Sequence, residues 1–188
     1  MAKTETEPVR SPRKGYRIPP VTELSVFCKV KPGREQAIRE VFNPSPEEHA
    51  ATVKAVKDVG TLHNARYVLF DNGTRLLIAT TFDGDWDVYI DDFAASYVLD
   101  AWDKFLIYCE GYPDEGKAIL TVDEVKEFLS AYQVTAADFM MDYPGVTTKE
   151  IKQALRVQAA VQESLDNPEA GEALQHPALK PLREVAAG

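Results

Sequence analysis

The sequence has little cysteine, no long hydrophobic run and no excess of positive charge, and each of these absences excludes a class of protein. Cys28 and Cys109 are its only cysteines, which is too few for a disulfide scaffold and typical of a reducing compartment. The apolar runs at 67–70 and 76–79 are far shorter than the roughly 20 residues that a membrane-spanning helix needs. A formal charge of -9 argues against nucleic acid or an anionic membrane as the main partner. We therefore expect a cytoplasmic protein whose partner is a small ligand or another protein.

Complete motifs for metal, nucleotide or covalent chemistry are also missing. The aspartates between 83 and 92 lack the ligand spacing of a calcium loop, and helix capping explains them. Gly111 and Gly116 lack the preceding strand of a phosphate-binding loop. Cys109 is expected to be more exposed than Cys28, but no histidine or redox pair lies near it in the sequence to activate it. No metal site and no nucleotide site is predicted.

The length and composition indicate one globular domain. Of the 188 residues, 45% are hydrophobic and 27% are charged, which are ordinary values for a protein with a single buried core. Residues 1–20 combine prolines with basic residues and are predicted to be a flexible N-terminal tail. The domain is expected to cover residues 21–166, followed by a proline-interrupted C-terminal tail at 167–188.

Four segments have the character of β-strands. Apolar and polar residues alternate over 24–30, as in a strand with one buried face. The segments 63–70 and 75–82 are rich in aromatic and β-branched residues, and they flank an Asp-Asn-Gly turn at 71–73. This is the strongest hairpin signal in the sequence, so the two strands should be antiparallel neighbours. The segment 136–143 is predicted to be the last strand.

The other periodic segments predict helices. Ser45 and Thr121 each begin a capping box, with a glutamate three residues later. An apolar stripe at helical spacing runs over residues 86–105, and an interruption is expected near Ser96 because this helix would be unusually long. The stripe is interpreted as core. The predicted helices are 37–42, 45–58, 86–105, 122–132, and a last one that starts at Thr147 and ends before Pro168.

The order of these elements is strand, helix, hairpin, helix and strand. It predicts an α+β fold with an antiparallel sheet of the ferredoxin-like β-α-β-β-α-β type and with extra helices. In that fold the helices cover one face of the sheet. The other face of a single copy stays open, so it either binds a partner or is covered by a second copy of the chain.

Several short segments also carry a resemblance to a known family. Residues 62–68 contain a His-x-Ala-Arg segment, residues 82–86 read Phe-Asp-Gly-Asp-Trp, and residues 143–145 read Tyr-Pro-Gly. With the segment 75–77 and the start of the helix that follows, they resemble a bacterial group that is similar to the dimeric α+β barrel superfamily. The resemblance covers roughly residues 23–165.

The resemblance implies a homodimer in which two sheets face one another around a ligand cavity. The superfamily includes cofactor-free monooxygenases, haem-degrading enzymes, chlorite dismutases, dye-decolourising peroxidases and small isomerases. We therefore expect a protein that binds a small ligand, with an oxygenase-like or peroxidase-like activity and with either haem or no cofactor. The alternative is a non-catalytic accessory protein whose open face binds a partner enzyme.

Two residues of the second predicted strand are the candidate catalytic groups. His63 could act as an acid, a base or a haem ligand, or it could make a purely structural hydrogen bond. Arg66 could bind the carboxylate of a ligand, or it could pair with Asp83, Asp85 or Asp87. In a regular strand the two residues would lie on opposite faces. The residues expected to line the ligand cavity are Phe27, Tyr67, Thr80 and Tyr143.

Overall fold

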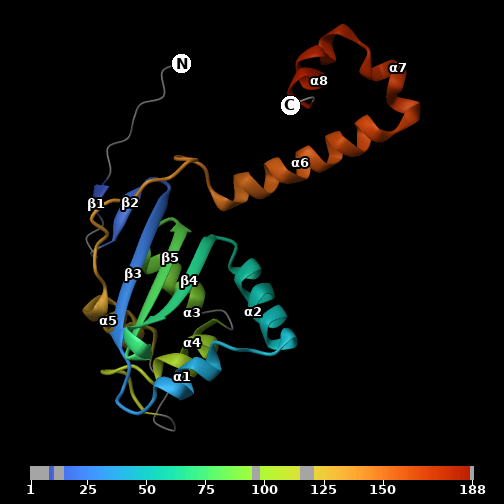
Figure 1. The fold of residues 1–188 in the computed structure, drawn as a ribbon. Coiled ribbons are helices and arrows are strands. Elements are labelled where there is room, and N and C mark those ends of the chain that lie inside the picture. Colours follow the sequence, from blue (N-terminus) through green and yellow to red (C-terminus); the bar gives the residue numbers. More distant parts are fainter. Residues whose placement is uncertain (1–8, 11–14, 95–97, 115–120, 187–188) are drawn as a thin grey trace. The chain divides into compact units, whose positions relative to one another are not determined.

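The computed structural model describes residues 9–10, 15–94, 98–114 and 121–186 (Figure 1). The chain divides into two compact units, one up to Thr148 and one from Lys149 onward. The predicted interruption of the long helix near Ser96 falls at residues 95–97, outside the described residues.

The first unit is an α+β structure built on an antiparallel sheet. Its four-stranded part has the order β2-β3-β5-β4, and the two-residue strand β1 pairs with the outer edge of β2. The three strands predicted at 24–30, 63–70 and 75–82 are confirmed, and the last two form the predicted antiparallel hairpin. The strands are β1 (Val9–Arg10), β2 (Tyr16–Ile18), β3 (Val21–Lys29), β4 (Leu62–Phe70) and β5 (Arg75–Asp83). Strand β2 therefore lies within the segment predicted as a tail.

The hairpin turn η1 (Asp71–Gly73) joins β4 to β5. All three of its residues have positive φ, with 49° at Asp71, 57° at Asn72 and 89° at Gly73. Asparagine and glycine adopt this conformation more easily than other residues, which explains the turn sequence. Gly73 also lies against the Arg39 guanidinium, where an added Cβ atom would stand 2.6 Å from a nitrogen. A side chain at this position would therefore displace Arg39.

The described part of the first unit forms five helices. The predicted capping boxes at Ser45 and Thr121 are both present, because each hydroxyl accepts from the backbone of its glutamate and each glutamate accepts from the backbone of the cap. Helix α2 ends at Gly60, whose φ of 79° gives the left-handed conformation common after a helix. The helices are α1 (Glu35–Val41), α2 (Pro46–Val59), α3 (Trp86–Ala94), α4 (Val98–Leu106) and α5 (Val122–Tyr132).

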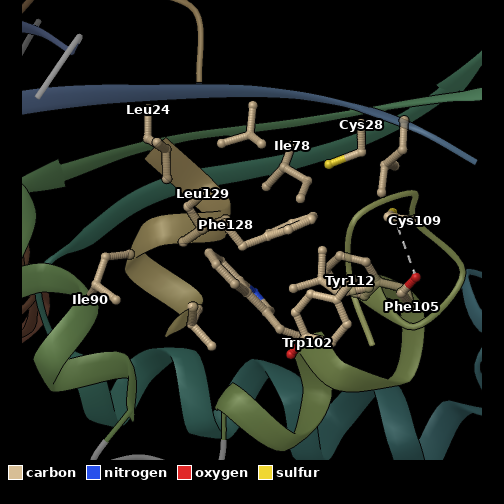
Figure 2. Close-up of a cluster of buried hydrophobic side chains, with 14 of the residues drawn as sticks. Leu24, Cys28, Ile78, Ile90, Trp102, Phe105, Cys109, Tyr112, Phe128 and Leu129 are labelled. Carbon is tan, nitrogen blue, oxygen red and sulfur yellow. Dashed lines mark hydrogen bonds between the residues drawn. The ribbon is translucent and has the colours of Figure 1, made fainter. Parts of the chain in front are cut away.

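The core lies between one face of the sheet and these helices. Leu24 and Cys28 of β3 and Ile78 of β5 point from the strands toward Phe128 of α5 and Trp102 of α4 (Figure 2). The predicted apolar stripe of residues 86–105 supplies much of this core, as expected. Its buried members are Trp86, Tyr89, Ile90, Phe93, Trp102 and Phe105, none more than 4% exposed.

The prediction of a strand at 136–143 is wrong, because no strand forms there. The chain reaches the edge of β3 but pairs with it at only one bridge, between Gln133 and Val26. Farther along that edge β2 already pairs with β3, and the buried carboxylate of Glu23 accepts the backbone N–H groups of Tyr16 and Ala136. A side chain thus replaces the ladder of hydrogen bonds that a full strand would have made.

The second unit is helical. Helix α6 (Thr148–Asp166) confirms the helix predicted to end before Pro168. The segment predicted as a C-terminal tail contains short helical elements, namely η2 (Pro168–Ala170), α7 (Gly171–Leu174), η3 (Pro177–Leu179) and α8 (Lys180–Ala186). No described residue of this unit belongs to the buried hydrophobic core. No helix in the described parts of the chain has the length and apolar composition needed to cross a membrane.

Candidate functional site

The face of the sheet opposite the core, here called the open face, carries side chains in rows across three strands. Residues that pair directly across strands share a face, so the strand register defines these rows. Phe27 of β3, Leu77 of β5 and Val68 of β4 form an apolar row. The neighbouring row consists of Ser25, Ala79 and Arg66, and the next of Glu23, Thr81 and Asn64. The open face thus changes from apolar to polar along the strands.

The apolar row is partly open to solvent. Phe27 is 42% exposed and Val68 is 43% exposed, although both pair with β5 within their strands. Phe70 extends the row by an edge-on contact with Phe27, with ring centroids 6.4 Å apart. Large exposed apolar side chains that lie together on a sheet are typical of a binding surface or a protein interface.

His63 lies at the polar end of this face because β4 is not regular. A β-bulge between Leu62 and Asn64 inserts His63 as an extra residue in the pairing with β5. The bulge lets the His63 ring reach Asp83, which shares the open face with Ala79 and Thr81. The placement of His63 and Arg66 on opposite faces, which was expected only for a regular strand, therefore does not apply to β4.

Asp83 is the centre of a hydrogen-bond network at this end of the sheet. Its Oδ1 atom lies 2.8 Å from Nε2 of His63. Its Oδ2 atom accepts from the backbone N–H of Thr148, at 2.8 Å, and also from the Thr148 hydroxyl. Only 12% of the His63 side chain and 13% of the Asp83 side chain are exposed. One carboxylate thus joins the end of β5, the bulge of β4 and the first residue of α6.

The hydrogen bond to Asp83 fixes the chemistry of the His63 ring. An ionised carboxylate only accepts hydrogen bonds, so Nε2 of His63 carries the hydrogen that it donates to Asp83. In the neutral ring Nδ1 is then the atom that can take up a proton. A carboxylate that holds an imidazole in one tautomer is the arrangement of histidine bases in many enzymes. The structural hydrogen bond and the acid–base role foreseen for His63 are therefore compatible.

Arg66 has no carboxylate partner among the residues that the structure describes. The three aspartates that were its expected partners bind elsewhere: Asp83 to His63, Asp85 to Arg17 and Asp87 to Lys126. The pairing of Arg66 with one of these aspartates is therefore wrong. Arg66 is exposed beside Ala79, one row from the apolar side chains. Its guanidinium can bind the carboxylate of a ligand or of another protein.

The residues expected to line one cavity do not come together. Phe27 lies on the open face, whereas Thr80 and Tyr67 pair into the face covered by helices. The Tyr67 hydroxyl accepts a hydrogen bond from the indole N–H of Trp102, at 3.1 Å, and its ring stacks on Phe42. Desolvation at this contact raises the pKa of Tyr67. Tyr143 lies in the segment after α5 and is 69% exposed.

The two cysteines belong to the core and not to the site. Cys28 is 2% exposed and Cys109 is fully buried, so the expectation of a more exposed Cys109 is wrong. A single bridge between Val30 and Cys109 brings the segment after α4 against β3 and so places the thiols together. A hydrogen bond with Cys109, together with burial, raises the pKa of the Cys28 thiol. Both features disfavour a thiolate nucleophile.

The His63 geometry does not fit a haem ligand. Its Nε2 atom, the nitrogen that usually binds iron, lies 2.8 Å from Oδ1 of Asp83 and is engaged by that carboxylate. Within the described ranges no group of three or more His, Cys, Asp or Glu residues could hold a metal ion.

Asp83 and Thr148 are the functional residues that sequence reasoning missed. The sequence assigned Asp83 to helix capping and Thr148 to the start of the last helix, and neither was connected with His63. The Phe-Asp-Gly segment at 82–84 pointed to Asp83, but nothing in the sequence indicated its bond to a residue 65 positions away.

Comparisons with protein-family models, with curated proteins and with solved structures each gave no match. The resemblance to the dimeric α+β barrel superfamily therefore stays a prediction.

Proposed function

We propose that this protein is a homodimer that binds a small apolar ligand bearing one anionic group between the open faces of two sheets. The observation that carries the proposal is the open face itself. An exposed apolar row lies next to Arg66, which has no ion partner among the described residues, and His63 lies at the polar end of the same face. The apolar row would hold the body of the ligand and Arg66 its charge.

A second copy is the proposed cover for the open face. An interface with two-fold symmetry brings the same patch of both copies together, so the apolar rows around Phe27 would face each other. The order β3-β5-β4 is also that of three strands in a ferredoxin-like sheet. The chain near Gln133 lies along β3, where the fourth strand of that fold would stand. These features support the ferredoxin-like, dimeric barrel arrangement that the sequence resemblance implies.

His63 gives the proposed site a proton acceptor. With Nε2 committed to Asp83, Nδ1 is available to remove a proton from a weakly acidic group of the bound ligand. Removal of a proton from the substrate is the step for which an oxygenase-like enzyme without a cofactor would need a basic side chain. A peroxidase-like reaction through haem is not supported, because the His63 geometry does not fit that role. The two free thiols favour the cytoplasm as the compartment.

Ligand binding can be tested with anilinonaphthalene sulfonate, a fluorescent dye that combines an apolar body with one anionic group. We expect the wild-type protein to bind it, and Arg66→Gln to weaken binding about tenfold, the effect of losing one charge-assisted hydrogen bond. Arg75→Gln is the matched control, because Arg75 lies at the end of the same face but already pairs with Asp71 at 3.2 Å. Equal affinity of the Arg66 and Arg75 variants would refute the role of Arg66.

The proposed interface can be tested by light scattering and native mass spectrometry. Phe27→Asp places a charge in the apolar row and should convert the dimer into monomers. Val88→Asp is the control, because Val88 is 57% exposed but lies on α3, away from the open face. A wild-type dimer that survives Phe27→Asp would exclude the open face as its interface. A stable complex with an unrelated chain in place of the homodimer would favour the accessory role.

A further inference from the structure

Helix α6 has an apolar stripe that the described residues cover only in part, because Ile151, Val161 and Leu165 are half-buried and Ala154 is exposed. Ile151, Ala154, Val161 and Leu165 follow one another at spacings of three, seven and four residues, which place them on one side of the helix. Leu155 flanks the stripe and is 58% exposed. None of the described residues of the second unit enters the buried hydrophobic core. A stripe of this kind is stabilised when another apolar surface packs on it.

The charges of α6 are divided between its two halves. The first half, up to Arg156, holds Lys149, Lys152 and Arg156 against Glu150, which gives a net charge of +2. The second half holds Glu163 and Asp166 and no cation, which gives -2. The helix dipole favours the reverse pattern, with acidic residues near the N-terminus and basic residues near the C-terminus. This distribution therefore costs the isolated helix stability and points to a partner of complementary charge.

We propose that α6 packs antiparallel against α6 of a second copy of this chain. In that arrangement the basic half of each helix lies along the acidic half of the other, so the same sequence is complementary to itself. Lys152 would approach the partner's Glu163 and Asp166, which lie on the same flank of the stripe. The two-fold axis passes near the middle of the helix, at about Gln158.

Gln158 supports a pairing of this kind. It lies between Ala154 and Val161 in the apolar stripe, where a polar side chain needs a hydrogen-bond partner on the opposing surface. An amide both donates and accepts hydrogen bonds, so the amides of two copies near the axis can satisfy each other. This contact is separate from the contact between open faces proposed above, and either could exist without the other.

Charge reversal tests the antiparallel arrangement directly. Lys152→Glu and Glu163→Lys should each weaken the homodimer at least tenfold, because each places like charges opposite one another in both symmetric contacts. A mixture of the two single variants should form heterodimers preferentially, and a chain with both substitutions should again form homodimers. Sedimentation or native mass spectrometry measures each outcome. Single variants that dimerise as well as the wild type, or a mixture that shows no preference, would overturn the proposal.

Cross-linking tests the position of the axis. The native thiols of Cys28 and Cys109 are buried, so a short bis-maleimide should react only with an introduced cysteine. We expect Gln158→Cys to give a covalent dimer and Leu165→Cys, on the same stripe, to give none, because the two copies of residue 165 lie about 20 Å apart along antiparallel helices that cross at residue 158. Cross-linking at both positions would indicate parallel helices, and cross-linking at neither would exclude the contact through this stripe; either result would overturn the proposal.

A third variant separates this inference from the proposed function. If Gln158→Cys still cross-links in a chain that also carries Phe27→Asp, α6 pairs without the contact between open faces. If Phe27→Asp abolishes a dimer that the charge variants of α6 leave intact, the contact between open faces stands and the α6 pairing is wrong. A wild-type chain that is monomeric at micromolar concentration overturns both.

Discussion

The Asp83 network makes a quantitative prediction about stability. Asp83→Ala removes the acceptor for three donors: Nε2 of His63, the backbone N–H of Thr148 and the Thr148 hydroxyl. A hydrogen bond contributes about 1 kcal/mol net, and about 1.5–3 kcal/mol when one partner is charged. The side chains of His63 and Asp83 are 12% and 13% exposed, so water can replace only part of what is lost. We expect the free energy of unfolding to fall by about 3 kcal/mol.

Two milder substitutions each remove one part of this network and so measure its separate contributions to the free energy of unfolding. Thr148→Val keeps the shape of the side chain and the backbone N–H but removes the hydroxyl, so it should cost about 1 kcal/mol. His63→Gln should cost about as much. If the residues act through Asp83, the double variant His63→Gln, Asp83→Ala should lose less than the sum of its single variants, by about 1 kcal/mol or more.

Urea unfolding followed by tryptophan fluorescence measures these changes, since Trp86 and Trp102 are both buried. With a slope of about 2 kcal/mol per molar urea, Asp83→Ala should lower the midpoint by roughly 1.5 M. A loss below about 1 kcal/mol, or strictly additive losses for His63 and Asp83, would show that the carboxylate does not join these elements. Nitrogen NMR of the His63 ring provides an independent check, with the hydrogen expected on Nε2 in the wild type and on Nδ1 in Asp83→Asn.

Two further predictions concern the core and the helix caps. Burial raises the pKa of Tyr89 far above the value of about 10 for an unfolded chain, so its contribution to stability is complete below about pH 10 and decreases as the pH rises further. Above about pH 10, the free energy of unfolding of Tyr89→Phe should therefore fall less steeply with pH than that of the wild type, by about 1.4 kcal/mol per pH unit. Urea unfolding at several alkaline pH values measures this dependence, and the same pH dependence in both proteins would contradict the burial of this hydroxyl. Thr121→Ala removes the capping box of α5 and should lower the free energy of unfolding by about 1 kcal/mol, whereas Thr74→Ala, which removes only a hydroxyl bond within the hairpin turn, should cost less. Equal thermal shifts for the two variants would contradict the importance of the cap.

The sequence predicted the elements whose signals are local. The Asp-Asn-Gly turn gives the hairpin because its residues tolerate positive φ, and no distant contact is needed. The caps at Ser45 and Thr121 follow from side chains that bond to backbone three residues away. The aromatic stripe of 86–105 was recognised as core because its helical spacing leaves one apolar side to bury.

The tertiary structure decided the features that depend on competition between distant groups. The strand predicted at 136–143 fails because Glu23, more than 100 positions earlier, bonds to the backbone N–H of Ala136. Arg66 lacks the aspartate partners that its neighbourhood in sequence suggested, because Arg17 and Lys126 take two of them from other elements. An acceptor can be reached by several donors, and only the folded chain determines which donor lies close enough.

The candidate site shows the same division. The sequence identified His63 and Arg66 by residue type, but it could assign them to faces only for a regular strand, because period-two alternation assumes one. One bulged residue changes the face of every side chain beyond it, and whether a bulge forms depends on pairing with β5 and on the bond to Asp83. Local chemistry is therefore set by the sequence itself. The face of the sheet on which a side chain lies is set by pairing between distant strands. The free energy of that pairing depends on residues far apart in the sequence, so no short segment predicts it.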